Sequence, residues 1–212
     1  MHEHFNQAFF DERYRSKPML WSGNPNPQLV AEIADLPPGT ALDVGCGEGA
    51  DAIWLAERGW HVTAADFSQV ALDRAAARAA ILDPEIANRI EWLHTDFTSW
   101  VPDPASYDLV SAHFFHLPKV LRDVVFRALA AAVSPGGTLL IVGHHPSDMQ
   151  APIMRPSMAD SYFTAEELVT ELLVPNEWDV VVADSRERAT TNAEDQRVTI
   201  HDTVLRATRG EL

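Results

Sequence analysis

The chain of 212 residues contains a single cysteine, Cys46, and only 16 basic residues against 31 acidic ones. One cysteine cannot form a disulfide within the chain, and free thiols are typical of reducing compartments, so we expect a cytoplasmic protein. A net charge of −15 repels phosphate backbones and anionic lipid surfaces. We therefore expect neither nucleic acid nor membrane as a partner.

Long apolar runs and a secretory signal are also lacking. The longest apolar stretches are too short to span a bilayer, and residues 1–18 contain no basic segment followed by an apolar core. Hydrophobic residues nevertheless make up 46% of the chain, which is enough to build a full core. We find no internal repeat and no low-complexity linker, and we expect a single domain over residues 1–212.

Short β-branched runs alternate with alanine-rich helical runs, a pattern typical of βα units and a parallel sheet. The pattern predicts helices at 4–15, 27–35, 51–58, 70–82, 117–133 and 165–173, and strands at 40–44, 61–65, 89–94, 107–112, 138–142, 177–185 and 197–207. Only the polar stretch 186–196 separates the last two strands, so an antiparallel hairpin is expected there. The sequence therefore predicts an α/β fold with a Rossmann-like, doubly wound, seven-stranded, mostly parallel sheet.

The most informative stretch is LDVGCGEGADAIWLAERGW, residues 42–60, in which a strand runs through a glycine-rich turn into a helix. Gly45 permits a tight turn, and Gly47 lets a ligand approach the backbone. Asp66 ends the next strand about 20 residues later, where a carboxylate can accept hydrogen bonds from ribose hydroxyls. This combination predicts a nucleoside-containing cofactor.

The charges in the turn narrow the choice of cofactor. Glu48 lies within the turn and Asp51 at the start of the helix, and both would repel a pyrophosphate. S-adenosylmethionine carries a sulfonium and an ammonium group and no phosphate, so it suits these carboxylates. A nicotinamide-dependent oxidoreductase fits the glycine pattern literally and stays open as an alternative, as does a non-catalytic protein that binds S-adenosylmethionine.

LDVGCGEG, the acidic end of the second strand and HTDF at 94–97 resemble class I S-adenosylmethionine-dependent methyltransferases, in particular the bacterial tellurite-resistance-like and thiopurine-methyltransferase-like branch. Residues 9–30 resemble the N-terminal cofactor lid of that branch. The resemblance spans roughly residues 9–145 and implies methyl transfer from S-adenosylmethionine. We further expect three parts within the domain, namely lid helices at 1–38, a cofactor-binding core at 39–145, and a C-terminal helix and hairpin at 146–212.

The resemblance implies roles at the amino-acid end and the ribose of the cofactor. Asp43 and the backbone of Gly45 and Gly47 would hold the amino-acid end, and Asp66 would hold the ribose. The end of the fourth strand, from Ser111 to His113, would pass near the methionine part of the cofactor.

Further roles follow from the same resemblance at the adenine and at the lid. Phe67 would lie against the adenine, Asp96 would accept a hydrogen bond from its amino group, and Phe97 would flank it. Arg15 and Trp21 would close over the cofactor, where a guanidinium can grip a carboxylate. A surface charge and a packing tryptophan are the competing interpretations of these two lid residues.

The sequence after the fourth strand reads SAHFFHLP and lacks the Asn/Asp-Pro-Pro-Tyr motif of amino-methyltransferases that act on adenine or glutamine. We therefore expect a small-molecule acceptor. Direct in-line attack on the sulfonium methyl is the expected reaction, because the protein then chiefly aligns the partners and excludes water.

Histidines follow the fourth and fifth strands, at the carboxyl edge where ligands bind in doubly wound sheets. The candidates for a general base are His113, His116 and His144, with simple packing as the alternative for each. No cysteine or glutamate stands at a supporting spacing, so no metal site is predicted. The candidates for the lining of an acceptor pocket are Trp21, Phe114, Phe115, Met154 and Met158. The sequence leaves the acceptor atom open, and also the choice between a monomer and a homodimer.

Overall fold

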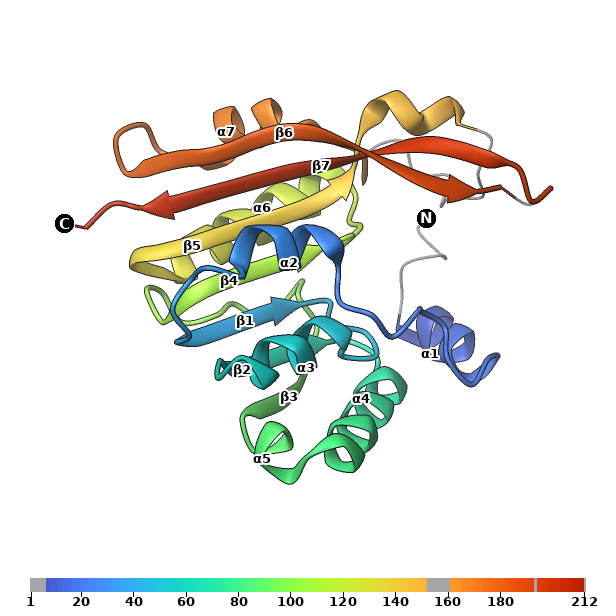
Figure 1. Ribbon diagram of the computed structural model, residues 1–212. Coiled ribbons are helices and arrows are strands. Elements are labelled where there is room, and N and C mark those ends of the chain that lie inside the picture. Colours follow the sequence, from blue (N-terminus) through green and yellow to red (C-terminus); the bar gives the residue numbers. More distant parts are fainter. Residues whose placement is uncertain (1–6, 152–160, 193, 212) are drawn as a thin grey trace.

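Figure 1 shows the computed structural model, which describes residues 7–151, 161–192 and 194–211. Seven strands form one sheet in the order β3-β2-β1-β4-β5-β7-β6. The parallel strands are β1 (Thr40–Val44), β2 (His61–Asp66), β3 (Ile90–His94), β4 (Tyr107–His113) and β5 (Val133–His144). The antiparallel hairpin consists of β6 (Trp178–Thr191) and β7 (Arg197–Arg209). The predicted fold class is confirmed.

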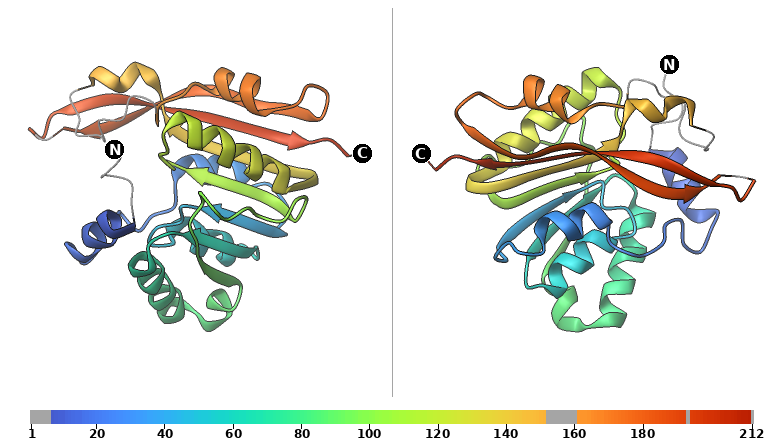
Figure 2. Two further views of the ribbon diagram at one scale, coloured as in Figure 1. Left: turned by 180° about the vertical axis from the view of Figure 1, so that it is seen from behind. Right: turned by 45° about the horizontal axis from the view of Figure 1, so that its top comes forward.

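Helices cover both faces of the sheet, and Figure 2 shows α6 on the side opposite α2 and α3. The helices of the first half are α1 (Gln7–Arg15), α2 (Pro27–Ile33), α3 (Ala50–Glu57), α4 (Gln69–Leu82) and α5 (Pro84–Ala87). Those of the second half are α6 (Lys119–Ala132), the 3₁₀ helix η1 (Pro146–Gln150) and α7 (Ala165–Leu172). No helix among the described residues is both long and apolar enough to cross a membrane.

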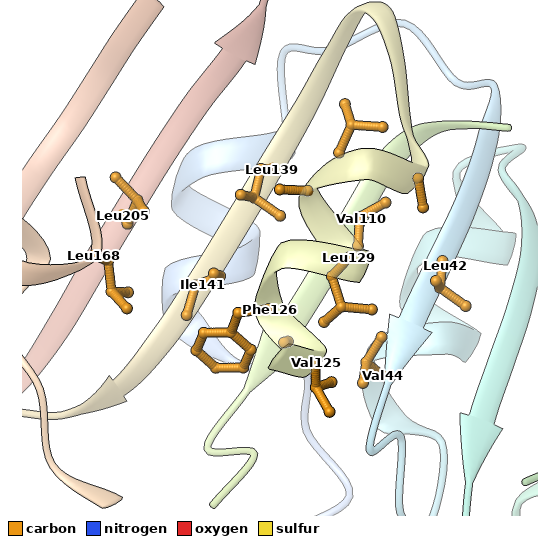
Figure 3. Close-up of a cluster of buried hydrophobic side chains, with 14 of the residues drawn as sticks. Leu42, Val44, Val110, Val125, Phe126, Leu129, Leu139, Ile141, Leu168 and Leu205 are labelled. Carbon is orange, nitrogen blue, oxygen red and sulfur yellow. The ribbon is translucent and has the colours of Figure 1, made fainter. Parts of the chain in front are cut away.

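Two hydrophobic cores form because successive strand residues point to opposite faces of a sheet. Ala41 of β1 joins the core under α2 and α3, whereas its neighbour Leu42 joins the core under α6 and α7. Figure 3 shows Phe126 and Leu129 of α6 packed onto the strands in this second core. Burial on both faces makes the central strands apolar along their length, as the sequence predicts.

The chain reverses its direction of travel across the sheet between β1 and β4. It passes from β1 outward to β2 and β3, then returns to place β4 on the other side of β1. Asp43 of β1 pairs in register with Ser111 of β4. Ligands bind in doubly wound sheets at such a switch point, beyond the carboxyl ends of the strands. The glycine turn after β1 lies at this place.

Several element boundaries differ from the predicted ones. The predicted helix 117–133 begins at Lys119 and ends at Ala132, and the turn expected at 134–137 lies within β5. Val133 already pairs with Tyr107 before the register shifts, which explains why the strand assignment starts early. The short helices α5 and η1 were not predicted, because each is a single capped turn that starts at a proline.

The C-terminal hairpin is longer than predicted. The stretch 186–196 was expected to separate two strands, but β6 continues to Thr191, which pairs with Arg197. The β5–β7 pairing ends at His144 and Asp202, so the distal part of the hairpin extends beyond the carboxyl edge of β5 (Figure 1). Polar residues suit this part because it lies outside the layered core.

Candidate functional site

The turn after β1 holds the backbone in conformations that favour glycine. Gly45, Gly47 and Gly49 have φ angles of 70°, 52° and 75°. The Gly45 and Cys46 amides both donate to the Ala65 carbonyl, at 2.8 and 3.1 Å, and the Gly49 amide donates to the Cys46 carbonyl at 2.9 Å. These amides are therefore committed to the protein itself.

Asp66, at the end of β2, binds the remaining glycine amide of the turn. Its buried carboxylate accepts hydrogen bonds from the Gly47 amide at 2.9 Å and the Ser68 amide at 2.8 Å. Burial raises the pKa of Asp66, and these backbone hydrogen bonds act in the opposite direction. Asp66 thus ties the end of β2 to the turn, and its ribose-binding role stays a prediction.

The lid covers the turn through a residue that the sequence did not single out. A Cβ atom added at Gly47 would lie 2.9 Å from the hydroxyl oxygen of Tyr14, the last buried residue of α1. The indole of Trp21 donates a hydrogen bond to this hydroxyl at 3.3 Å. Burial, followed by the Asp66 carboxylate, raises the pKa of Tyr14. Tyr14 therefore contacts the turn more closely than Arg15, its neighbour in the chain.

Arg15 and Trp21 take different positions relative to the turn. The Arg15 side chain is 58% exposed and pairs with Asp11 at 3.8 Å, an interaction along α1 itself. Trp21 is half exposed and lies beneath the guanidinium of Arg13, 5.4 Å from its ring centroid. The structure thus brings Trp21 to the turn and leaves Arg15 on the outer side of the lid helix.

The segment from Leu20 to Asn26, here called the strap, is tied to the turn by carboxylates. Glu48 accepts hydrogen bonds from the Leu20 and Trp21 amides at 3.0 and 3.1 Å and forms an ion pair with Arg74 at 3.1 Å. Asp51 accepts a hydrogen bond from the Asn26 amide at 2.6 Å. These contacts explain why both acidic residues stand at the turn.

Asp43, Asp51 and His113 form an acidic cluster beside the turn. The Asp51 carboxylate lies 2.8 Å from His113 Nδ1, and one ligand-type atom from each of the three residues lies within 4.8 Å of the others. Burial first, and then the Asp51 carboxylate, raises the pKa of Asp43 to about 7, while His113 acts in the opposite direction. The prediction of no metal site considered His113 only together with the other histidines after the fourth and fifth strands, and it did not consider Asp43 and Asp51 as further ligands.

The residues predicted for the adenine follow β2 and β3. Phe67 packs against Phe10 of α1 with ring centroids 5.1 Å apart. Asp96 accepts hydrogen bonds from the Thr98 amide and hydroxyl at 2.8 and 2.7 Å and is exposed. Phe97 is buried in the α6 core against Phe115. Phe67 and Asp96 thus lie at the carboxyl edge of the sheet, whereas Phe97 packs in the hydrophobic core beneath that edge.

The three candidate histidines separate into two groups. His113 belongs to the acidic cluster, whereas His116 and His144 stack on each other with centroids 4.7 Å apart and planes inclined by 22°. The Phe114 ring lies 4.7 Å from that of His144, and Tyr162 lies 5.8 Å from it. These four rings, here called the aromatic cluster, line the carboxyl ends of β4 and β5.

The residues predicted for the acceptor pocket, and the free cysteine of the turn, are considered next. Phe115 approaches the turn, since a Cβ atom at Gly45 would lie 2.7 Å from its ring. Met154 and Met158 lie outside the described residues. Burial raises the pKa of the Cys46 thiol, and the carboxylates of Asp66 and Asp43 add to this shift. A protonated thiol suits a structural role.

Comparisons with known proteins agree with this geometry. Residues 41–137 match the family described as "Methyltransferase domain". The region from β1 to the start of β5 is thus similar to methyltransferase domains. An uncharacterized methyltransferase of Mycobacterium tuberculosis is 37% identical over 125 residues, which cover 58% of this chain and 59% of the relative.

A trans-aconitate 2-methyltransferase of Sinorhizobium medicae is 33% identical over 164 residues, which cover 74% of this chain and 55% of the relative. The chain thus spans little more than half the length of these two relatives. The crystal structure of TehB from Haemophilus influenzae aligns with a TM-score of 0.68 at 18% identity, covering 96% of this chain and 66% of TehB. That similarity concerns the fold.

Proposed function

We propose that the protein transfers a methyl group from S-adenosylmethionine to a small-molecule acceptor by direct in-line displacement. The observation that carries this proposal is the state of the turn after β1. The amides of Gly45, Cys46, Gly47 and Gly49 are engaged within the protein, and carboxylates surround them. A pyrophosphate requires free amide donors and is repelled by carboxylates. A cationic cofactor without phosphate does not require these donors, and carboxylates attract it.

The buried polar atoms of the site fit the same cofactor. Asp43 Oδ2 and His113 Nε2 are buried and have no hydrogen-bond partner among the residues that the structure describes, and the ammonium of an amino acid can donate to an ionised carboxylate and to an unprotonated imidazole nitrogen. In our proposal Asp43 with Gly45 and Gly47 holds the amino-acid end, and Asp66 holds the ribose. When bound, the cofactor supplies a methyl group on a positively charged sulfur.

The adenine and the lid complete the proposed cofactor site. Phe67 and Asp96 receive the adenine, and Phe97 supports them. Trp21 closes over the cofactor and excludes water together with Tyr14, which lies directly above Gly47. Arg15 requires a rearrangement of its pairing with Asp11 to reach a cofactor carboxylate.

We propose the aromatic cluster as the acceptor side of the site. Phe114 has a φ angle of 50°, which is unusual for a bulky residue and marks a backbone held under strain at the strand end. His116 or His144 then serves as the base that removes a proton from the acceptor. The name of one relative, trans-aconitate 2-methyltransferase, supports a small acceptor.

The remaining parts of the proposal concern the whole chain. We propose that residues 1–212 form one domain with the lid, core and C-terminal parts defined above. We further propose that the protein acts in the cytoplasm as a monomer or homodimer, without nucleic acid or membrane as partner. Within class I we assign it to the tellurite-resistance-like and thiopurine-methyltransferase-like branch, to which the fold similarity to TehB lends support.

Calorimetric titration and a transfer assay test this function. S-adenosylhomocysteine is expected to bind, whereas NADH at the same concentration is not. A screen with radiolabelled S-adenosylmethionine then presents small thiols, phenols, amines and carboxylates as acceptors. Binding of NADH in preference to S-adenosylhomocysteine would contradict the proposal. Binding of S-adenosylhomocysteine without transfer to any acceptor would favour a non-catalytic binding protein.

A further inference from the structure

The C-terminal hairpin gathers positive charge on one of its faces. Arg186 and Arg188 are two residues apart on β6, and Arg206 of β7 points to the same face, which α2 covers. The three arginines share two carboxylates, those of Glu32 and Asp202. Positive charge is therefore in excess on this face, in a chain whose net charge is −15.

Two of these arginines are held by α2. The buried Glu32 carboxylate pairs with Arg186 Nη2 at 2.5 Å and with Arg206 Nη1 at 3.5 Å. Arg186 also donates a hydrogen bond to the side-chain oxygen of Gln28 at 2.9 Å. Arg186 and Arg206 thus join the hairpin to α2, and this structural role accounts for both charges.

Arg188 is paired in a different way. Its Nε and Nη2 atoms donate to the two oxygens of the buried Asp202 carboxylate at 2.9 and 3.1 Å. This pairing uses one edge of the planar guanidinium and leaves the edge with both Nη atoms available for a second planar partner. Arg188 has no other hydrogen bond or ion pair among the residues that the structure describes, and its side chain is 34% exposed.

Arg188 lies beside the aromatic cluster. Its guanidinium carbon is 5.9 Å from the centroid of the Phe114 ring, and this ring is 4.7 Å from that of His144. Asp202, which holds Arg188, pairs in register with His144 across β5 and β7. An oriented positive charge therefore stands at the acceptor side of the site proposed above.

We propose that Arg188 binds a carboxylate of the methyl acceptor and is thereby a specificity-determining residue that selects small carboxylic acids. The inference rests on the function proposed above and deepens it. A carboxylate presents two oxygens in one plane, which match the two Nη donors of the guanidinium. The acidic protein as a whole repels an anionic acceptor, so a local guanidinium is needed to select it over a neutral analogue. Asp202 is the positioning residue that fixes this guanidinium.

The test compares acceptor candidates that differ in the carboxylate alone. Three pairs each consist of a benzoate and its benzamide with the same para substituent, which is a thiol, a hydroxyl or an amine. A fourth pair is mercaptopropionate and its amide. Calorimetry on the protein saturated with S-adenosylhomocysteine gives the ratio of the two dissociation constants, a readout that does not depend on turnover. In at least one pair the wild type is expected to favour the carboxylate by about 10-fold or more, as for hydrogen bonds to a charged group.

The variants separate a contact with the acceptor from a structural role. Arg188→Gln alone would leave the buried Asp202 charge without its partner, so it is combined with Asp202→Asn, which also keeps the net charge of the protein unchanged. In this double variant the preference is expected to fall to about 2-fold or less, while the affinity for S-adenosylhomocysteine stays. Arg188→Lys keeps the charge without the planar fork and is expected to keep part of the preference.

Arg58→Gln is the matched control. It removes a guanidinium that also stacks on a ring, that of Trp54, but at the end of α3 opposite the turn. This variant is expected to keep the wild-type ratio of dissociation constants, because its charge lies away from the carboxyl edge of the sheet.

Several results would overturn the inference. If no carboxylate binds to the saturated protein, or if carboxylate and amide bind equally, Arg188 does not select an anionic acceptor. A double variant that keeps the full preference assigns the selection to another residue. Methyl transfer to neutral acceptors alone contradicts the inference but leaves the proposed function intact. If the protein does not bind S-adenosylhomocysteine, the proposed function itself fails, and this inference fails with it.

Discussion

The contact between Tyr14 and Gly47 makes the closed lid testable by a double-mutant cycle. In Gly47→Ala the new Cβ would lie 2.9 Å from the Tyr14 hydroxyl oxygen, shorter than an ordinary van der Waals contact. The substitution also places alanine at a φ of 52°, which costs roughly 1–2 kcal/mol. Because Tyr14 is 4% exposed, it cannot move aside into solvent without disturbing the lid.

Tyr14→Phe removes the hydroxyl and with it the close approach. It also removes the long hydrogen bond from Trp21, so it alone should cost about 0.5–1.5 kcal/mol. In the double variant the steric part of the Gly47→Ala penalty disappears while the backbone strain stays. The two substitutions should therefore be less destabilising together than their sum, by at least 0.5 kcal/mol or so.

Urea unfolding measures the free energy of unfolding for each member of the cycle. Gly59→Ala is the control, because Gly59 also has a positive φ of 91° but its added Cβ would meet only Pro38, at 3.6 Å. The effects of Gly59→Ala and Tyr14→Phe are expected to add within about 0.5 kcal/mol. If Gly47→Ala and Tyr14→Phe are equally additive, Tyr14 does not lie on the turn in the free protein and the reasoning is refuted.

Three further predictions follow from the site and the core. Because burial and then Asp51 raise the pKa of Asp43 to about 7, the folded protein holds this proton where the unfolded chain has released it. Stability of the ligand-free protein should therefore fall from about pH 4 to about pH 7, and Asp43→Asn should flatten this fall in thermal melts across that range; an unchanged slope would contradict the assignment. Glu48→Ala removes the acceptor for the Leu20 and Trp21 amides, so stopped-flow tryptophan fluorescence should show faster S-adenosylhomocysteine release, and an unchanged release rate would argue against the strap as a barrier. Phe126→Ala should lower the free energy of unfolding by about 3–5 kcal/mol, because the ring is fully buried and packs against Phe163. A loss below about 1 kcal/mol would contradict the packing in the second core.

The parallel part of the fold was predictable because its signals are local. The apolar runs, the glycine turn and the Ser68 cap, whose hydroxyl accepts from the Ala71 amide at 3.3 Å, each specify a boundary within a few residues. The C-terminal hairpin was underestimated because residues 186–191 are polar. A ladder of backbone hydrogen bonds to β7 does not require apolar side chains where neither face is part of the core.

The candidate site divides in the same way. The location of Asp43, Asp66 and His113 at one edge was predictable because each is the last or last but one residue of a parallel strand, and parallel strands bring their carboxyl ends to one edge. Tyr14 was not, because α1 has no apolar stripe strong enough to show which of its faces turns inward. Arg15 was selected from the sequence because of its charge, whereas the structure places the hydroxyl of its neighbour Tyr14 over the turn.

Asp51 links the parts of the site that sequence reasoning treated separately. Its two oxygens contact the strap and His113, so a single carboxylate joins the lid to the end of β4. If the strap opens, the Asn26 contact is lost and Asp51 gains freedom to rotate away from the imidazole. We therefore expect opening of the strap and reorientation of His113 to be coupled, because the observed position of Asp51 satisfies both partners at once. The helix dipole also favours a carboxylate at this place, because Asp51 lies in the first turn of α3.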